Sequence, residues 1–307
     1  MENNFKSGFV GIVGKPNVGK STLLNKLIGQ KIAVISPKPQ TTRGKILAIM
    51  TEEESQVVFL DTPGFHKPKN KLGETMIKAV NDTIADVDML IMVVEPDTNC
   101  NGAERAIIEK IADIPCILVI NKADTVKFDS LLPVIDFYSK QHDFVDIVPI
   151  SAKTGLGIDE LKKVIKDHLE IGPMFYPEDM ITDQQEKQVV AEIIREKMLY
   201  TLDKEVPHGT AVEIVKMKYN EHDSKPVYNI CANIYCEKAS HKGIIIGNGG
   251  SMLKKIGSMA RVDCEKMLDA KVYLELWVKV KQDWRNSNNL MKEFGLLEGN
   301  KTDISDI

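Results

Sequence analysis

The sequence predicts an α/β protein in which a doubly wound domain with a parallel sheet is followed by a smaller α+β domain. Over residues 9–170, short apolar runs alternate with helical stretches. Strands that are apolar on both faces are typical of a parallel sheet covered by helices on both sides. After residue 187 the expected elements follow the order α-β-β-α-α-β, which indicates a separate domain. The first domain is expected to bind its ligand at the carboxyl ends of its strands.

Five apolar runs in the first domain have the length of buried strands, at residues 9–13, 57–60, 88–94, 116–120 and 146–150. Helices are expected at residues 21–28, 72–85, 104–111, 131–139 and 157–169. In the second domain, strands are expected at residues 210–219, 227–237 and 271–281, with a turn at 223–226 and a long helix at 251–268.

Breaks in this pattern predict the domain boundaries. Gly172-Pro173 and Pro177 interrupt the alternation, and Thr182-Asp183-Gln184-Gln185 has the spacing of a capping box that opens the next helix. We therefore expect a first domain at residues 1–172, a linker at 173–186, a second domain at 187–285 and a polar C-terminal tail at 286–307.

The composition argues against several functional classes. The 307 residues are 43% hydrophobic and 27% charged, as in soluble globular proteins. No apolar run approaches the roughly 18 residues of a membrane span, and the N-terminus lacks a signal-peptide pattern, so a cytoplasmic location is expected. The five cysteines form no C-x-x-C pair, which favours reduced thiols over a zinc site or disulfides. A net charge of −4 predicts no general affinity for nucleic acid.

A phosphate-binding pattern lies directly after the first expected strand. The pattern G-x-x-x-x-G-K-[ST] is matched by Gly14-Lys15-Pro16-Asn17-Val18-Gly19-Lys20-Ser21, and a helix is expected to follow. The glycines let backbone N–H groups converge on phosphate oxygens, and the helix N-terminus adds partial positive charge. Lys20 is expected to reach the β- and γ-phosphates, and the Ser21 hydroxyl is expected to ligate Mg²⁺.

A carboxylate follows the second expected strand in the run Asp61-Thr62-Pro63-Gly64. Because Mg²⁺ prefers hard oxygen ligands and keeps several waters, Asp61 is expected to hold the ion at this strand end. The N–H of Gly64 is expected to contact the γ-phosphate, since a glycine permits close approach. Alone, this run is a common turn; its place one strand after the phosphate-binding pattern gives it meaning.

Two further motifs each follow a strand and point to guanine. Asn121-Lys122-Ala123-Asp124 offers the Asp124 carboxylate, which can accept hydrogen bonds from N1–H and the exocyclic amine of guanine, whereas adenine would leave it unpaired. The Lys122 stem is expected to lie over the base. In Ser151-Ala152-Lys153, the Ala152 N–H is expected to bind guanine O6, an acceptor that adenine lacks.

These four motifs, in this order, resemble those of the translation-factor-related class of P-loop GTPases over residues 8–170. The resemblance implies that the chain binds GTP or GDP with Mg²⁺ and hydrolyses GTP to GDP and phosphate. It places the first switch at Pro39-Gln40-Thr41-Thr42-Arg43. It also implies that one threonine completes the Mg²⁺ shell: we favour Thr42, with Thr41 left open. The alternative is a solvated polar loop.

Phe65 occupies the position after Gly64, where many signalling GTPases carry a glutamine that orients the attacking water. A phenylalanine cannot do this, so we expect slow intrinsic hydrolysis that a partner or another group raises. In related GTPases an asparagine at the position of Asn17 helps to hold K⁺ beside the phosphates, which would supply positive charge there. The alternative is that Asn17 is a turn residue only.

The second domain carries a glycine loop. Gly247-Asn248-Gly249-Gly250 is a G-x-x-G loop between two expected helices, with Ile245 and Ile246 before it and Lys254 and Lys255 after it. Together with the element order, it resembles a type II KH domain, whose loop clamps the backbone of about four nucleotides. The isoleucines are expected to form an apolar floor for unstacked bases. Additional phosphate contacts are considered for His241, Lys242, Arg261, Lys279 and Lys281.

A doubly wound P-loop GTPase domain followed by one C-terminal KH domain resembles the Era family of GTPases over nearly the whole chain. The resemblance implies a switch protein that binds small-subunit (16S) ribosomal RNA near its 3′ end and acts in 30S subunit assembly and rRNA processing. It also implies peripheral association with the inner face of the cell membrane, and we expect a monomer. One alternative is a tRNA-modifying GTPase, for which no cofactor-using segment is found. Another is a nucleotide-stabilised RNA-binding scaffold with negligible turnover, which Phe65 keeps open.

Overall fold

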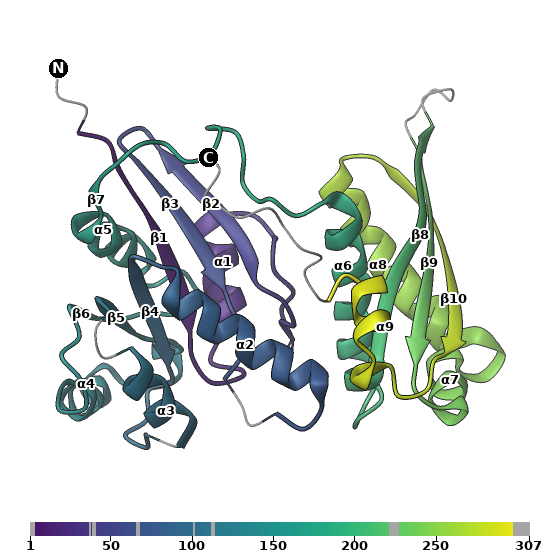
Figure 1. Cartoon of the computed structure of the whole chain (residues 1–307), viewed down its shortest axis with the longest axis horizontal. Helices are drawn as coiled ribbons and strands as arrows, with labels where there is room; N and C mark the ends of the chain where they lie inside the picture. The colour runs from purple at the N-terminus through teal and green to yellow at the C-terminus, as the bar shows by residue number, and fades with distance from the viewer. Residues whose placement is uncertain are drawn as a thin grey trace. The chain divides into compact units, whose positions relative to one another are not determined.

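The computed structural model describes residues 4–36, 38, 41–65, 68–100, 102–111, 114–220 and 227–296 (Figure 1). Pro39 and Gln40 of the expected first switch, the expected turn at residues 223–226 and the end of the expected tail lie outside these residues. The chain divides into two compact units. The first comprises Met1–Lys67 with Met76–Gln184, and the second comprises Gln185–Ile307 with Pro68–Thr75. The expected linker therefore falls mainly within the first unit.

The first unit is built on a mixed sheet with the order β2-β3-β1-β4-β5-β6, in which β7 also pairs with β1. Its strands are β1 (Lys6–Val13), β2 (Ile46–Glu52), β3 (Ser55–Asp61), β4 (Met89–Val94), β5 (Cys116–Ile120), β6 (Asp146–Pro149) and β7 (Glu170–Ile171). The pairs from β3 to β6 are parallel, as predicted. The sequence did not predict β2 and β7, which both pair antiparallel. A two-residue connection, Glu53-Glu54, joins β2 to β3 and contains none of the usual turn residues.

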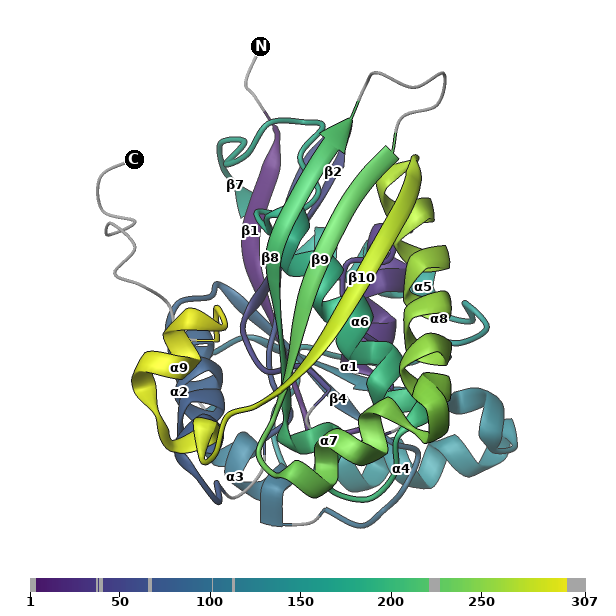
Figure 2. The ribbon, with the colours of Figure 1, turned by 90° about the vertical axis from the view of Figure 1, so that its right-hand side faces the viewer.

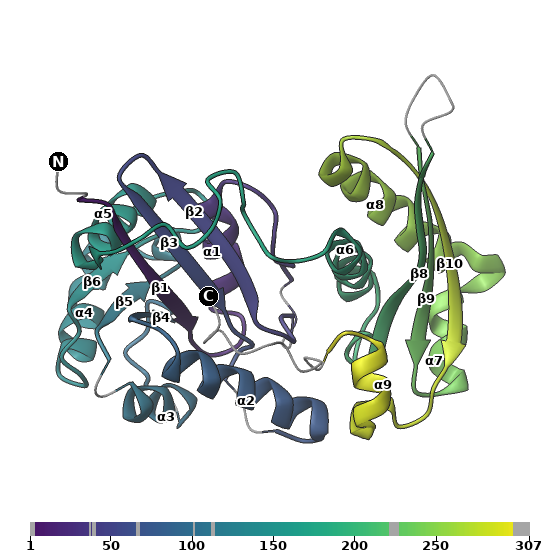
Figure 3. The same ribbon diagram turned by 45° about the horizontal axis from the view of Figure 1, so that its top comes forward.

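Helices cover both faces of this sheet (Figures 1 and 3). They are α1 (Lys20–Ile28), α2 (Lys71–Ala85), α3 (Gly102–Lys110), α4 (Leu131–Ser139) and α5 (Ile158–His168). One core lies beneath α1 and α5 and contains Leu24, Ile165 and Phe59. The other lies beneath α2, α3 and α4 and contains Ile107 and Leu118. Because every residue of β4 and β5 is buried, these strands read as continuous apolar runs.

The segment after β7 is tied to the sheet. The Gln56 side chain accepts hydrogen bonds from the backbone N–H groups of Phe175 and Tyr176, at 2.8 and 3.0 Å. The Thr182 hydroxyl donates to the carbonyl of Leu47 at 2.7 Å. The predicted capping box at residues 182–185 is therefore wrong, because Thr182 caps no helix and bonds to β2 instead.

The second unit begins with α6 (Glu186–Thr201). Gln185 is the residue before this helix, and its N–H donates to the Gln188 side chain at 3.3 Å. The remaining elements are β8 (Thr210–Asn220), β9 (Val227–Cys236), α7 (Ala239–Ile246), α8 (Ser251–Leu268), β10 (Lys271–Val280) and α9 (Asn288–Glu293). This reproduces the predicted α-β-β-α-α-β order.

The sheet of the second unit has the order β10-β9-β8, with β9 parallel to β10 and antiparallel to β8. Figure 2 looks onto this sheet, with α6 and α8 behind it. The core between them includes Ile194 of α6, Ile234 of β9 and Ile256 of α8, all with no exposed surface. The two long helices, α6 and α8, and the sheet thus share one apolar layer, which fixes the position of the glycine loop between α7 and α8.

The end of the expected second domain and the start of the expected tail are both anchored to the second unit. The Trp284 side chain is fully buried, and its Nε1 donates to the Gly209 carbonyl at 3.0 Å. The Phe294 ring stacks on Tyr235 with centroids 4.6 Å apart. Among the residues that the structure describes, no helix has the length and apolar character that crossing a membrane requires.

Candidate nucleotide site and nucleic-acid interface

The phosphate-binding pattern, residues 14–21, runs from the end of β1 into the first turn of α1 and is called the phosphate loop below. Gly19 precedes the helix with φ of 101°, and a Cβ at this position would lie 2.3 Å from Asn121 Nδ2. Only glycine fits there, because both the backbone conformation and the space exclude a side chain. The loop delivers backbone N–H groups to the N-terminus of α1, where an anion is favoured.

Lys20, Ser21, Thr42 and Asp61 meet beside this loop. The Ser21 hydroxyl donates to Asp61 Oδ2 at 2.8 Å and lies 2.9 Å from the Thr42 hydroxyl. Lys20 Nζ donates to the carbonyls of Gly14 and Lys15, both at 3.2 Å. The structure thus brings together the three residues predicted to bind Mg²⁺. The Thr41 hydroxyl instead donates to the Lys38 carbonyl, so of the two threonines it is Thr42 whose hydroxyl lies at this cluster.

The electrostatics of the cluster follow from burial. Burial raises the pKa of Asp61 to about 6, and the nearby Lys20 ammonium opposes this rise. Burial likewise lowers the pKa of Lys20 to about 8, and the Asp61 carboxylate opposes this fall. Asp61 Oδ1 is buried and accepts no hydrogen bond from any residue that the structure describes. A buried carboxylate oxygen beside two hydroxyls is a hard donor set, and it fits Mg²⁺ together with a nucleotide phosphate.

The run after β3 lies against the phosphate loop. The Thr62 hydroxyl donates to the Ile12 carbonyl at 2.8 Å, and the Phe65 N–H donates to the Gly14 carbonyl at 3.2 Å. A Cβ on Gly64 would lie 2.8 Å from Pro16 Cα, so the chain passes here only as glycine. Pro63 of the same run is buried.

The Phe65 ring does not lie free in the site. It packs against the core beneath α2 and α3, with Lys110 Nζ 6.0 Å from the ring centroid. An apolar ring in this environment has no group that could orient a water. Arg43 of the expected first switch is buried, and Gln40 lies outside the described residues.

The two guanine motifs come together through Asn121. Its Nδ2 donates to the Val18 carbonyl at 2.7 Å, and its Oδ1 accepts from the Ala152 N–H at 2.9 Å. The Ala152 N–H therefore already donates within the protein. For the predicted contact with guanine, this N–H has to be shared between Asn121 Oδ1 and guanine O6. Asp124 stands exposed in a short 3₁₀ turn, Ala123–Thr125, where its carboxylate is accessible to a base.

The other members of these motifs hold the loops. The Ser151 hydroxyl accepts from the Thr154 N–H at 3.1 Å, and Lys153 is exposed. Lys122 Nζ donates to the Asn17 carbonyl at 2.8 Å and to Glu95. Asn17 itself is exposed at the tip of the phosphate loop with φ of 67°. Glu95 was not predicted; an acidic residue directly after a buried strand is the signal that could have indicated it.

The glycine loop of the second unit connects α7 to α8. Gly247, Gly249 and Gly250 all have positive φ, and Asn248 and Gly249 are exposed. Lys254 and Lys255 in the first turns of α8 are exposed as well. The structure therefore presents a polar glycine loop at the N-terminus of a long helix, followed by cations.

Part of the predicted interface is wrong. Ile245 has no exposed surface and belongs to the core of the second unit, so it cannot form a floor for bases. Ile246 is half-buried against the same core and stays a predicted contact. The position of Ile245 on α7 faces the core, because a helix with a period of 3.6 residues turns only some of its side chains toward one face. His241 is also buried, which excludes it as a phosphate contact.

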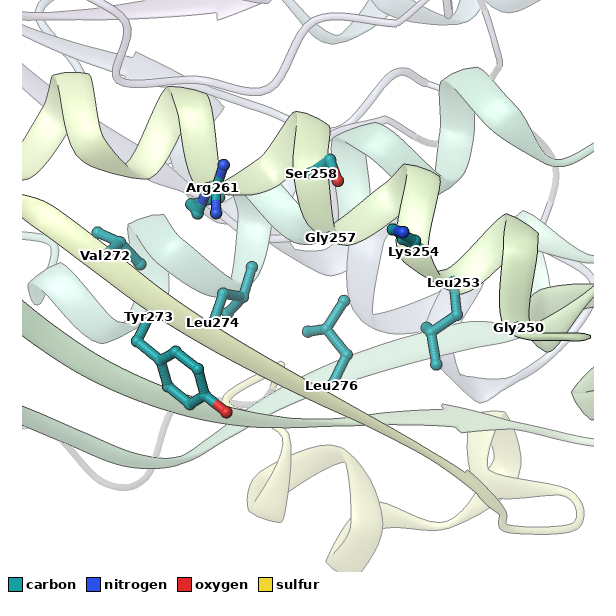
Figure 4. A pocket seen from close by; sticks show the side chains of 10 residues that line it. All are labelled: Gly250, Leu253, Lys254, Gly257, Ser258, Arg261, Val272, Tyr273, Leu274 and Leu276. Carbon is teal, nitrogen blue, oxygen red and sulfur yellow. The ribbon is translucent and has the colours of Figure 1, made fainter.

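A cavity of about 400 Å³ lies between α8 and β10, here called the α8/β10 groove (Figure 4). Figure 4 shows Lys254 and Arg261 on the helix and Tyr273, Leu274 and Leu276 on the strand. The remaining lining residues are Gly250, Leu253, Gly257, Ser258 and Val272. The apolar floor was expected from the isoleucines of α7, whereas Leu274 and Leu276 of the strand line this groove. A fully folded sheet was needed to find them, since they lie more than twenty residues along the chain from the glycine loop.

Two family models match the chain. A model described as a 50S ribosome-binding GTPase matches residues 9–122, and a KH domain model matches residues 205–285. GTPase Era of Ruminiclostridium cellulolyticum is 53% identical over 294 residues, covering 95% of this chain and 98% of that protein. GTPase Era of Clostridioides difficile is 52% identical over 294 residues, with the same coverage.

Two solved structures are similar over nearly the whole chain. One is Era in complex with MgGDPNP and nucleotides 1506–1542 of 16S ribosomal RNA, with 40% identity and a TM-score of 0.91. It covers 95% of this chain and 99% of that one. The other is a variant of Aquifex aeolicus Era bound to GDP·AlF₄⁻, with the same identity, TM-score and coverage.

Proposed function

This chain belongs to the Era family of GTPases, and on that premise we propose that it is a GTP-hydrolysing switch protein that binds 16S ribosomal RNA near its 3′ end and acts in 30S subunit assembly and rRNA processing. The observation that carries the RNA assignment is the 40% identity, at a TM-score of 0.91, to Era in complex with nucleotides 1506–1542 of 16S ribosomal RNA. The α8/β10 groove and its glycine loop are the surface to which we assign that RNA.

The nucleotide site performs the hydrolysis. The backbone N–H groups of the phosphate loop hold the phosphates, and Lys20 contacts the β- and γ-phosphates. Ser21, Thr42 and Asp61 would hold Mg²⁺, which would neutralise negative charge on the phosphates. Asp124 reads the guanine edge, and Asn121 ties the base loops to the phosphate loop through Val18.

Hydrolysis by this site needs a group that the chain does not offer next to Gly64. Phe65 cannot orient the attacking water, so the intrinsic rate is slow. We propose that K⁺ bound near Asn17 contributes positive charge beside the phosphates. Its support is the exposed position of Asn17 at the tip of the phosphate loop. Turnover is then faster in K⁺ than in Na⁺, and Asn17→Ala removes the difference; equal turnover in both salts overturns the K⁺ assignment.

RNA binding uses the chemistry of the α8/β10 groove. The glycine loop lets an RNA backbone approach the N-terminus of α8, and Lys254 and Lys255 neutralise phosphates. Bases lie over Leu274 and Leu276, which line the groove. A groove of this size takes a single strand whose bases are unstacked.

The test of the function is phosphate release with and without a 16S 3′-terminal fragment. A switch protein hydrolyses GTP measurably, and the RNA changes the rate at saturating GTP. A nucleotide-stabilised scaffold instead retains RNA affinity with no measurable phosphate release above a Lys20→Ala control. An RNA of the same length and base composition in scrambled order separates sequence recognition from charge.

We propose a cytoplasmic location with peripheral association at the inner face of the cell membrane, and a monomer in solution. The support for membrane association is the family resemblance alone. Fractionation of cells at low and high salt tests it: a peripheral protein sediments with membranes at low salt and is released at high salt. Recovery only in the soluble fraction at both salt concentrations contradicts the association. Light scattering of the purified chain tests the monomer.

A further inference from the structure

A chain of alternating charges connects the guanine motif to the phosphate loop. Lys122 Nζ contacts Glu95 Oε1, and the other oxygen of the same carboxylate, Oε2, lies 3.3 Å from Lys15 Nζ. Lys122 Nζ also donates to the carbonyl of Asn17 at 2.8 Å. Glu95 directly follows β4, so it lies at the carboxyl end of that strand, between the two loops that it joins.

The same chain continues into the protein. Lys15 Nζ lies 3.3 Å from Glu104 Oε1, and the Glu104 side chain has no exposed surface. Glu104 belongs to the first turn of α3, and a hydrogen bond joins it to the buried Tyr138 of α4. Lys15 is thus anchored on a buried carboxylate independently of Glu95. Within the part of the chain that the structure describes, Lys122 has no ion pair with a second carboxylate, so the loss of Glu95 affects Lys122 more than Lys15.

Burial and charge both mark Glu95 as part of this arrangement. Its side chain is 33% exposed, and that of Lys122 is 39% exposed. Burial opposes ionisation of Glu95, but the hydrogen bond and charge of Lys122, followed by those of Lys15, lower the pKa of the carboxyl below its ordinary value. The carboxylate is therefore charged at neutral pH and holds two ammonium groups that repel each other in its absence.

We propose that Glu95 is a positioning residue for nucleotide binding, which holds the Lys122 side chain extended between the base loop and the Asn17 peptide. The inference rests on the binding of a guanine nucleotide at this site. Asn17 is in the left-handed region, with φ of 67°, and the Lys122 ammonium is the group that fixes its carbonyl. With Lys122 fixed, its methylene stem forms a preformed wall for the base, and the ordering of that side chain is not lost on binding.

The consequence of removing the charge follows from these contacts. In Glu95→Gln the amide replaces one carboxylate oxygen, and Lys122 retains only the neutral Asn17 carbonyl and a weaker hydrogen bond. The Lys122 side chain then has to become ordered when the nucleotide binds, which weakens binding. The nucleotide is therefore expected to dissociate faster. Lys20 and Thr42, the groups expected to act at the γ-phosphate, form their hydrogen bonds with other residues than Glu95 in the described structure. The rate at saturating GTP is therefore expected to change little.

The test measures GDP affinity and dissociation with a fluorescent GDP analogue on the full chain. We expect Glu95→Gln to raise the dissociation constant about tenfold, mainly through a faster dissociation rate. Turnover at saturating GTP should stay within about twofold of the unmodified chain, so that KM changes and kcat does not. The matched control is Glu52→Gln, because Glu52 forms an ion pair with Lys166 at 2.6 Å with both side chains 36% exposed. Glu52 belongs to β2 and pairs with Ser55, the first residue of β3, whereas Asp61 is the last residue of β3. This ion pair therefore lies at the end of β3 opposite the nucleotide site.

A double-mutant cycle identifies the route of the effect. In a Lys122→Met background, Glu95→Gln should change the GDP dissociation constant less than about twofold, because the group it positions is gone. An equal loss of affinity in both backgrounds overturns the positioning role, and so does an unchanged affinity of Glu95→Gln in the unmodified background. If the unmodified chain itself fails to bind GDP, the proposed function fails first, so the two failures are distinguishable. A melting temperature of Glu95→Gln equal to that of Glu52→Gln excludes a general loss of folding as the cause.

Discussion

The Ser21 hydroxyl donates to Asp61 Oδ2 at 2.8 Å, so that the first turn of α1 and the last residue of β3 meet in one cluster. The two residues lie 40 positions apart in the chain, and the parallel pairing of β1 with β3 brings them together. Thr42 joins the same cluster from the segment that precedes β2. The pairing of β1 with β3 therefore positions two of the expected Mg²⁺ ligands, and the segment before β2 adds the third.

This cluster predicts different roles for two adjacent threonines. Thr42→Ala should weaken binding of a non-hydrolysable GTP analogue in Mg²⁺ by about tenfold, because it removes an expected ligand of the metal. Thr41→Ala should change it less than about twofold, since the Thr41 hydroxyl bonds to Lys38 instead. Titrations of both variants with and without EDTA measure this. A larger effect of Thr41→Ala than of Thr42→Ala would exchange the two assignments.

The exposed Asp124 carboxylate predicts base specificity. In Asp124→Asn the side chain can no longer accept from both N1–H and the exocyclic amine of guanine, but its amide can donate to the 2-carbonyl of xanthine. GTP affinity should fall by about a hundredfold or more, and XTP affinity should rise. Competition between the two nucleotides for the same fluorescent probe measures the switch. Equal losses for both would mean that Asp124 maintains the loop and does not read the base.

The cations after the glycine loop predict how RNA binding depends on salt. Lys254→Ala combined with Lys255→Ala should weaken binding of a 16S 3′-terminal fragment, and should reduce the slope of log affinity against log salt by about one to two. Lys140→Ala is the matched control, because Lys140 is an exposed lysine of α4's C-terminal end, in the first unit. An unchanged slope would place the RNA backbone away from α8.

The burial of Ile245 predicts a loss of stability. Ile245→Ala removes a fully buried side chain and should lower the free energy of unfolding by about 2–5 kcal/mol. Ile244→Ala should change it by less than about 0.5 kcal/mol, because Ile244 is 50% exposed. Chemical denaturation followed by circular dichroism compares the two variants. If both lose little stability while RNA binding is lost only in Ile245→Ala, the original assignment of this residue to the RNA floor is right.

Much of the fold could be predicted because most strands of the first unit are short, continuous apolar runs in the sequence. The run at residues 116–120 is apolar throughout and buried on both faces, and the structure forms β5 over those residues. The first residue of α8 could be predicted because Ser251 follows a glycine loop. The hairpin between β2 and β3 was missed, since Glu53-Glu54 is not a usual turn sequence and tertiary pairing alone selects it.

The candidate site residues also fall into those that a local motif identifies and those that only the folded chain brings together. Lys20 and Asp124 belong to contiguous motifs whose spacing carries their geometry. Ile245 was assigned to the RNA surface because a run of isoleucines does not reveal which one a short helix turns inward. Leu276 and Glu95 could not be found, because each acquires its role only when a strand places it beside residues far away in the chain.

We propose that this chain couples its guanine-nucleotide site to its RNA-binding unit. Linkage requires that if GTP changes RNA affinity, RNA changes GTP affinity by the same factor. The direct measurement is the dissociation constant of a 16S 3′-terminal fragment for the chain loaded with GDP and with a non-hydrolysable GTP analogue. We expect tighter binding with the GTP analogue, by about fivefold or more. Identical dissociation constants in the two nucleotide states would contradict it.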